Sequence, residues 1–414
     1  MYECTREQTA MKIFVENGAQ DLGYEIAKRL LSKARKYHLT VIELECLYII
    51  LNHVQVCTGN KKAFVNVCKE LRYTHQKLHA ETEAEIVYSE VSHLYAVTSS
   101  DHIENVPFIE ECVHKLELLL SEFDTFKTRI RYFLLRSLLC QVQRQFTKRI
   151  EACEDAIQYF KSNPDIAGNF VGVFTLEKIE SHLHVRKYEV LLKLCKESVV
   201  LFNKHSSNWL EIHYYEIIAL LSTGQTIKAL EVFRVVQKIL KKNGGGAKKN
   251  HDHWLIIEGY IYLFLHTENK ELLPTSFQLP SMEVYMRKFL TQGLYALSGD
   301  KEGANVGMMI LHIFLLLCLK SNPTDIMEKV KALDRYKRRY LNQSSNTRTE
   351  LFITILRHYS FSAADMQKTS TKMKELFWQL SPESDPTSTS TEDYELIPFD
   401  IIWKRLMQFY GVDI

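Results

Sequence analysis

Residues 213–240 constrain the fold of this chain more than any other segment. The first half places Ile217, Leu220 and Leu221 on one helical face. The second half repeats the arrangement with four apolar residues, Ala229, Leu230, Phe233 and Val236. The polar stretch 222–225, Ser-Thr-Gly-Gln, interrupts the pattern between the halves. Two helices joined by so short a turn lie antiparallel, and each buries its apolar stripe on the other and on the next pair.

The composition favours helices along the whole chain. Of the 414 residues 46% are hydrophobic, which supplies a sizeable core, and only 15 Gly and 8 Pro interrupt it. No segment alternates between apolar and polar residues with period two, so we expect almost no strand. The length fits two or three globular domains, or one long repeat array.

Charge, cysteines and the first residues bear on location and partners. The net charge of +2 gives no whole-chain field that would attract nucleic acid, an acidic ligand or a membrane surface. The nine cysteines are scattered and never form a CxxC pair, so we interpret them as reduced core residues. Residues 1–14 carry charges where an export signal needs an apolar core. The most apolar run, 306–319, is shorter than the roughly 20 residues of a membrane-spanning helix. We therefore expect a cytoplasmic protein without a membrane partner.

Helical periodicity recurs with only short interruptions between the segments. The clearest case is 21–37, where apolar residues return at steps of three and four and basic residues lie near the C-terminal end, which suits the helix dipole. The other predicted helical segments are 7–17, 40–57, 61–79, 82–98, 106–123, 127–143, 252–267, 281–298, 303–320, 324–342, 346–360 and 363–380.

Two segments match each other at a constant offset of 42 residues, and a third follows after 38 more. A recurring antiparallel helix pair of about 34–47 residues is typical of a helical solenoid, in which each unit buries its face only by stacking on its neighbours. Aligning 146–160 with 188–202 pairs Phe146 with Tyr188, Ile150 with Leu192, Cys153 with Cys195, Ala156 with Ser198, Ile157 with Val199 and Phe160 with Phe202.

This spacing resembles the tetratricopeptide repeat, and the chain is similar to divergent, functionally uncharacterised tetratricopeptide-like proteins of bacteria. That repeat has a small residue near the middle of its first helix, an aromatic residue early in the second, and two small residues seven apart. The usual Trp, Gly and closing Pro are mostly missing here, and the resemblance covers three or four units. The positions that fit are Tyr24, Ala27, Leu31 and Ala34, then Gly224, Ala229 and Phe233, and more loosely Ser137, Phe146, Cys153 and Ala156.

The resemblance implies an all-α protein, a right-handed α–α superhelix of antiparallel helix pairs. We expect this array to span 1–380, with a break at the loop 241–250 left open. The polar, proline-containing stretch 381–393 is predicted to be a disordered linker. Residues 394–414 are predicted to form an amphipathic C-terminal helix with its apolar face made by Ile402, Trp403, Leu406 and Phe409.

The C-terminal helix has two interpretations. It can cap the open end of the array, because terminal units must hide an otherwise exposed apolar face. It can instead dock in the groove of this or another chain. We favour the cap.

No motif marks a catalytic or metal site. The chain contains neither GxSxG nor HExxH. The loop 244–249 lacks the GxxxxGK[ST] spacing of a phosphate-binding loop, and His251 and His253 have no further ligand at a metal-site spacing. We therefore expect no enzymatic activity, no cofactor and no metal.

A basic stretch at 335–340 contains four Arg and Lys residues and two Tyr. Such a stripe can hold RNA phosphates while its aromatic rings stack on bases. It lies on one predicted helix only, beside acidic neighbours, so a solvated helix face is the better interpretation. We do not expect nucleic-acid binding.

The resemblance implies a non-catalytic scaffold that binds a protein or peptide segment in a concave groove lined by the first helix of each pair. Two alternatives stay open: a helical-repeat RNA-binding protein, which predicts a continuous basic stripe, and a ligand-sensing switch that releases the C-terminal helix. The sequence leaves the partner and the oligomeric state undefined. The candidate groove residues are Arg131, Gln141, Glu180, His184, Glu211 and Tyr214.

Overall fold

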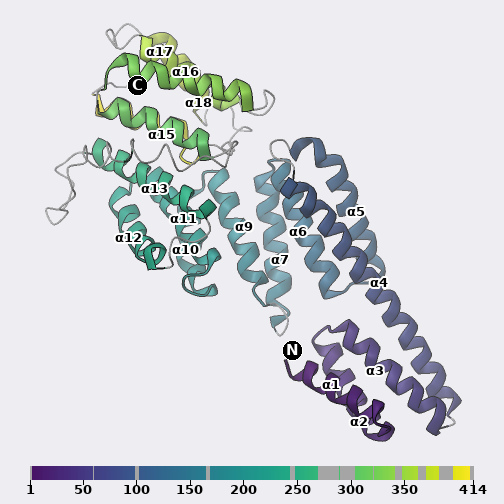
Figure 1. Ribbon diagram of the computed structural model, residues 1–414. Coiled ribbons are helices and arrows are strands. Elements are labelled where there is room, and N and C mark those ends of the chain that lie inside the picture. The colour runs from purple at the N-terminus through teal and green to yellow at the C-terminus, as the bar shows by residue number, and fades with distance from the viewer. Residues whose placement is uncertain are drawn as a thin grey trace. The chain divides into compact units, whose positions relative to one another are not determined.

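The computed structural model describes most of the chain, and all of the secondary structure in this part is helical (Figure 1). The expectation of an all-α protein is thus confirmed for these residues. The described residues are 2–58, 60–97, 102–164, 168–242, 248–268, 289, 304–319, 321–340, 347–361, 370–381 and 395–410.

The chain divides into two compact units. The first comprises Met1–Thr98, His102–Gln145 and Glu151–Val171, and the second comprises Ser99–Asp101, Phe146–Ile150 and Gly172–Ile414. Of the predicted linker 381–393, only residue 381 is described, and residues 394 and 411–414 of the predicted C-terminal helix also lie outside the described residues.

In the first unit, helices that follow one another in sequence pack against each other. One apolar core lies among α1, α2 and α3, and another among α4, α5 and α6. The helices are α1 (Tyr2–Glu16), α2 (Gln20–Lys36), α3 (Thr40–His53) with a π-helical extension (Val54–Thr58), α4 (Lys61–Val97), a 3-10 turn (His102–Asn105), α5 (Val106–Glu122), α6 (Phe126–Val142) and most of α7 (Phe146–Lys161).

The second unit is built around one large apolar core, to which helices from α11 to α19 contribute. Its helices are most of α9 (Phe170–His184), then α10 (Tyr188–Ser198) with a 3-10 turn (Val199–Leu201), α11 (Ser207–Ser222), α12 (Thr226–Lys242), α13 (Lys248–Thr267), α15 (Ala304–Cys318), α16 (Pro323–Tyr340), α17 (Thr347–Phe361), α18 (Ser370–Leu380) and α19 (Phe399–Phe409).

The most apolar helix, α15, lies inside this second core. Ile310, Leu311 and Phe314 are fully buried. The helix comes close to α13 at Gly259, where an added Cβ atom would lie 2.5 Å from a methyl carbon of Leu311. Among the helices that the structure describes, none is both long enough and apolar enough to cross a membrane.

Helix α4 corrects one prediction. The sequence pattern suggested separate helices at 61–79 and 82–98, but Lys61–Val97 is a single helix. Residues 79–82, His-Ala-Glu-Thr, include neither Gly nor Pro, so nothing ends the helix there. Tertiary contacts fix the middle of α4, because buried Glu81 accepts a hydrogen bond from Thr40 (2.6 Å) and pairs with Lys127 (3.0 Å).

Five turns between consecutive helices share one geometry. In each, the second residue after the helix has a positive φ: Gly18, His38, Arg144, Arg186 and Gly224, with φ between 53° and 82°. The N–H of the following residue donates to the carbonyl five positions earlier at 2.8–2.9 Å, which satisfies one of the free carbonyls at the helix end. The next helix then begins two residues after the positive-φ position, as at Gln20, Thr40, Phe146, Tyr188 and Thr226.

The shared turn accounts for the internal repeat in the sequence. Arg144 and Arg186 are separated by 186 − 144 = 42 positions, which is the offset at which the two segments match. The aligned small residues have the same environment, since Cys153, Cys195, Ala156 and Ser198 are all buried. Equivalent turns therefore place equivalent residues in the helix interfaces.

Replacing Gly224 by Ala tests the turn directly. No atom lies within 4 Å of the position that a Cβ would take, so the substitution adds backbone strain at φ +74° without a clash. We expect a loss of about 1–2 kcal/mol in the free energy of unfolding, measured by urea denaturation. Gly224→Asn is the matched control, and it should lose less because Asn tolerates the left-handed region. Equal stability of Gly224→Ala and the native protein would contradict this role.

The C-terminal helix α19 packs on α13 and α18 of its own chain. Ile402, Trp403 and Leu406 are buried in the second core. Phe409 is partly buried, and its ring centroid lies 5.4 Å from that of His266. In this structure the apolar face of α19 is thus covered by its own chain.

A cluster of ion pairs anchors the segment that leads into α19; we name Arg186, Arg348, Glu395 and Asp400 the C-terminal ion-pair cluster. Arg348 donates two hydrogen bonds to Glu395, both of 2.9 Å, and lies 3.3 Å from Asp400. Arg186 pairs with the same Asp400 at 2.9 Å. Glu395 also accepts the backbone N–H of Phe399 at 2.7 Å, at the start of α19.

Removal of the buried carboxylate should destabilise the second unit. Glu395→Ala leaves the buried guanidinium of Arg348 without its main partner, and breaking such a pair costs about 3–5 kcal/mol. The control is Asp334→Ala, which removes the partner of the exposed Arg338 and should cost less than about 1 kcal/mol. Urea denaturation measures the free energy of unfolding of both variants. Similar losses of stability in the two variants would show that the C-terminal ion-pair cluster contributes no more than an exposed ion pair.

Candidate functional site

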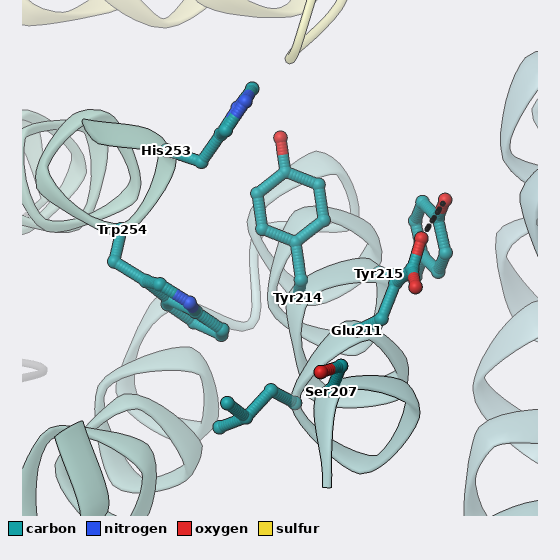
Figure 2. Close-up of a pocket in the computed structure, with 7 residues that line it drawn as sticks. Ser207, Glu211, Tyr214, Tyr215, His253 and Trp254 are labelled. Atoms are coloured by element: carbon teal, nitrogen blue, oxygen red, sulfur yellow. Dashed lines mark hydrogen bonds between the residues drawn. The ribbon is translucent and has the colours of Figure 1, made fainter. Parts of the chain in front are cut away.

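A pocket of about 350 Å³ opens between α11 and α13 in the second unit (Figure 2). This volume is at the small end of the range for ligand pockets, roughly 300–1,000 Å³, and suits a side chain or a short segment. The described residues that line it are Ser207, Leu210, Glu211, Tyr214, Tyr215, His253 and Trp254.

The helical period explains why α11 contributes most of this lining. Ser206 caps the start of the helix by accepting the backbone N–H of Trp209 at 3.2 Å. From there Ser207, Leu210, Glu211 and Tyr214 occupy positions i, i+3, i+4 and i+7, which places them on one face. Most of the other α11 residues are buried in the core, and this stripe is the part of α11 that lines the pocket.

Tyr214 lies at the centre of the pocket. Figure 2 shows its ring between Trp254 and His253 on one side and Glu211 and Tyr215 on the other. Its ring centroid is 5.8 Å from that of Trp254, 6.1 Å from that of His253 and 5.7 Å from that of Tyr215, all in edge-to-face arrangements. Within the part of the chain that is described, no hydrogen-bond partner faces the Tyr214 hydroxyl. This group can therefore bind a ligand atom.

Glu211 is the acidic group of the pocket. Tyr215 donates its hydroxyl proton to Glu211 Oε1 at 3.2 Å. The protein around the carboxylate raises the pKa of Glu211 mainly by desolvation and secondly through the charge of Glu180, while the hydrogen bond from Tyr215 opposes the rise. Burial, followed by these carboxylates, raises the pKa of both Tyr214 and Tyr215, so the two phenols remain neutral donors at physiological pH.

A buried arginine supports the neighbouring carboxylate. Arg149 comes from the part of α7 that belongs to the second unit, and its Nη1 lies 2.7 Å from Glu180 Oε2. Its Nη2 lies 3.9 Å from Glu177. With three carboxylates, including that of Glu211, and one guanidinium, the ionised group carries a net charge of −3 + 1 = −2.

The structure brings three of the predicted groove residues together. Glu211 and Tyr214 line the pocket, and Glu180 acts on Glu211 and both tyrosines through its charge. His184 is in the same unit but stacks flat on Phe146, with ring centroids 4.0 Å apart. The His184 ring therefore takes part in packing α9 against the start of α7.

Arg131 and Gln141 lie on α6 in the first unit, whereas the pocket residues belong to the second unit. Arg131 pairs with Glu85 at 2.7 Å and lies over the ring of Tyr88, 4.5 Å from its centroid. Gln141 is partly buried near the end of α6. These contacts give Arg131 a role in joining α6 to α4.

Most of the pocket lining is not indicated by the sequence pattern. Ser207 and Leu210 could have been found, because they precede Tyr214 at helical steps on the same face. In the sequence, His253 stands out only as a possible metal ligand beside His251. Trp254 and His253 meet Tyr214 through the packing of α13 on α11, and no local pattern indicates that contact.

Eight cysteines are free thiols, as the scattered spacing predicted: Cys4, Cys46, Cys68, Cys112, Cys140, Cys153, Cys195 and Cys318. Burial raises the pKa of Cys46 and of Cys318 to about 12. Thiols with such values are protonated at neutral pH and are poor nucleophiles. The described part of the chain also contains no group of three or more His, Cys, Asp or Glu residues arranged to hold a metal ion.

Comparison with known proteins gives no family for this chain. No protein-family model matches its sequence, and no curated protein shows significant similarity to it. The pocket must therefore be interpreted from its own chemistry, which combines aromatic rings, neutral phenol donors and a carboxylate with a raised pKa.

Two substitutions should move the pKa of Glu211 in opposite directions. Tyr215→Phe removes the hydrogen bond that favours the ionised carboxylate, so the pKa of Glu211 should rise further. Glu180→Gln removes the neighbouring negative charge, so that pKa should fall. Carbon-13 NMR of the Glu211 carboxyl group as a function of pH measures both shifts. Shifts of the same sign in the two variants would contradict this account of the site.

Proposed function

We propose that the protein is a non-catalytic scaffold that binds a segment of a partner protein across α11, with side chains of that segment inserted into the pocket. The main observation behind the proposal is the row of α11 residues that lines the pocket. Leu210, Glu211 and Tyr214 line an open cavity together with Trp254. Aromatic rings with a polar edge are typical of surfaces that anchor a protein partner.

The recurring turn supports a repeat architecture of the tetratricopeptide-like kind. Equivalent turns at Arg144, Arg186 and Gly224 begin helices whose residues match in sequence. In a solenoid built from such pairs, the first helix of each pair faces the ligand. Here α11 is the first helix of the pair that it forms with α12. The free cysteines support a cytoplasmic location for this scaffold.

The two alternative functions, RNA binding and a ligand-sensing switch that releases α19, have less support. An acidic pocket repels phosphate groups, which argues against RNA binding at this site. In the basic stretch of α16, Arg338 is paired with Asp334 at 2.7 Å. A switch that releases α19 would have to break the C-terminal ion-pair cluster, and a ligand would need several kcal/mol of differential affinity to do so.

Partner capture from native lysate tests the proposal. We expect full-length protein to retain a specific set of partners and Tyr214→Ala to lose it, because this change removes the central ring of the pocket. Tyr2→Ala, at a tyrosine that is 82% exposed, is the matched control and should keep the set. Quantitative mass spectrometry measures retention, and thermal melting checks that Tyr214→Ala is folded. Identical partners for the native protein and a folded Tyr214→Ala variant would overturn the proposal.

A further inference from the structure

We infer that the pocket on α11 selects a cationic side chain, that of an arginine or lysine in the bound protein segment. This inference rests on the proposed function and defines the chemistry of the ligand. The observation behind it is the pairing of an acidic group with an aromatic ring in one cavity, at Glu211 and Tyr214.

The charges around the pocket favour a cation. Glu211 faces the charge of Glu180, so a positive ligand group beside Glu211 would relieve a repulsion that exists in the free protein. Arg149, the buried cation nearby, is already paired with Glu180 and with Glu177. None of the described lining residues is a lysine or an arginine, so a ligand cation meets no fixed positive side chain among them.

The aromatic groups fit the same ligand. A guanidinium or ammonium group is attracted to the face of a Tyr or Trp ring when it lies within about 6 Å of the centroid. Figure 2 shows the Tyr214 ring beside Glu211, with its hydroxyl directed away from α11. The aliphatic part of an Arg or Lys side chain can pack on Leu210 and Trp254, which are also in the lining. The neutral Tyr214 hydroxyl is available to donate to a carbonyl of the bound segment.

Binding of a cation should be coupled to protonation. A positive group favours ionised Glu211 and lowers the pKa of that carboxyl in the complex, so affinity should fall as the pH falls through the raised pKa of the free protein. The titratable groups in the lining beside Glu211 are Tyr214 and Tyr215 on α11 and His253 on α13. The charged groups around them are Glu180 on α9 and Arg149 on α7, and Arg149 is paired with Glu180 and with Glu177 on α9.

The test uses fluorescently labelled short peptides with degenerate flanks and one fixed central residue: arginine, lysine, citrulline, norleucine or glutamate. Their binding to the full-length protein is measured by fluorescence polarisation. Citrulline keeps the shape of arginine without its charge. We expect the arginine and lysine pools to bind about tenfold more tightly than the citrulline and norleucine pools, as one cation–aromatic contact with a nearby carboxylate predicts.

Two variants assign the preference to this pocket. Glu211→Gln keeps the side-chain shape and should remove most of the preference for arginine over citrulline, with the protein still folded. Glu197→Gln, at an exposed position on α10, makes the same change in total charge and should leave the preference unchanged. Persistence of the full preference in Glu211→Gln would overturn the inference.

The remaining outcomes separate the inference from the proposed function. Pools that bind equally well, with binding lost in Tyr214→Ala, would overturn the cation preference and leave the peptide-binding scaffold in place. Failure of every pool to bind up to about 1 mM would overturn the scaffold and the inference together.

Discussion

The structure depends on one local constraint, the turn that reverses the chain between consecutive helices. A helix end leaves free carbonyl groups, and here a residue with positive φ folds the chain back so that the next N–H reaches one of them. Gly18 and Gly224 adopt this conformation without strain, while His38, Arg144 and Arg186 adopt it with a Cβ atom. The packing that the turn makes available stabilises these three positions, because each reversal brings two apolar stripes together.

The geometry of the pocket follows from that reversal. The turn at Gly224 holds α12 against α11, and these helices and α13 share one core with fully buried Ile217 and Leu221. Because one side of α11 is used in this core, its remaining stripe can face an open cavity. The site is therefore supported by rigid helices. Its acidic character depends on Glu211 together with Glu180 from α9.

The C-terminal segment covers part of the large core of the second unit. Phe399 stacks on Phe352 with ring centroids 4.2 Å apart, and Tyr410 donates its hydroxyl proton to the carbonyl of Leu317 at 2.6 Å. Apolar burial alone does not define the position of a helix along its neighbours. The buried pairs of Arg348 with Glu395 and Asp400 are directional, and they set where α19 begins.

The sequence by itself determined the helical class and most helix positions, because helical periodicity and turn residues are local signals. It also offered Glu211 and Tyr214 as candidates on one helix, without the rest of the stripe that they belong to. Only the tertiary structure decided that α4 is continuous, that Trp254 joins the pocket and that Arg149 supports Glu180. The pair of Arg348 and Glu395 likewise joins residues 47 positions apart. Such contacts come from packing between helices, and the pattern within any one helix contains no information about which distant side chain it will meet.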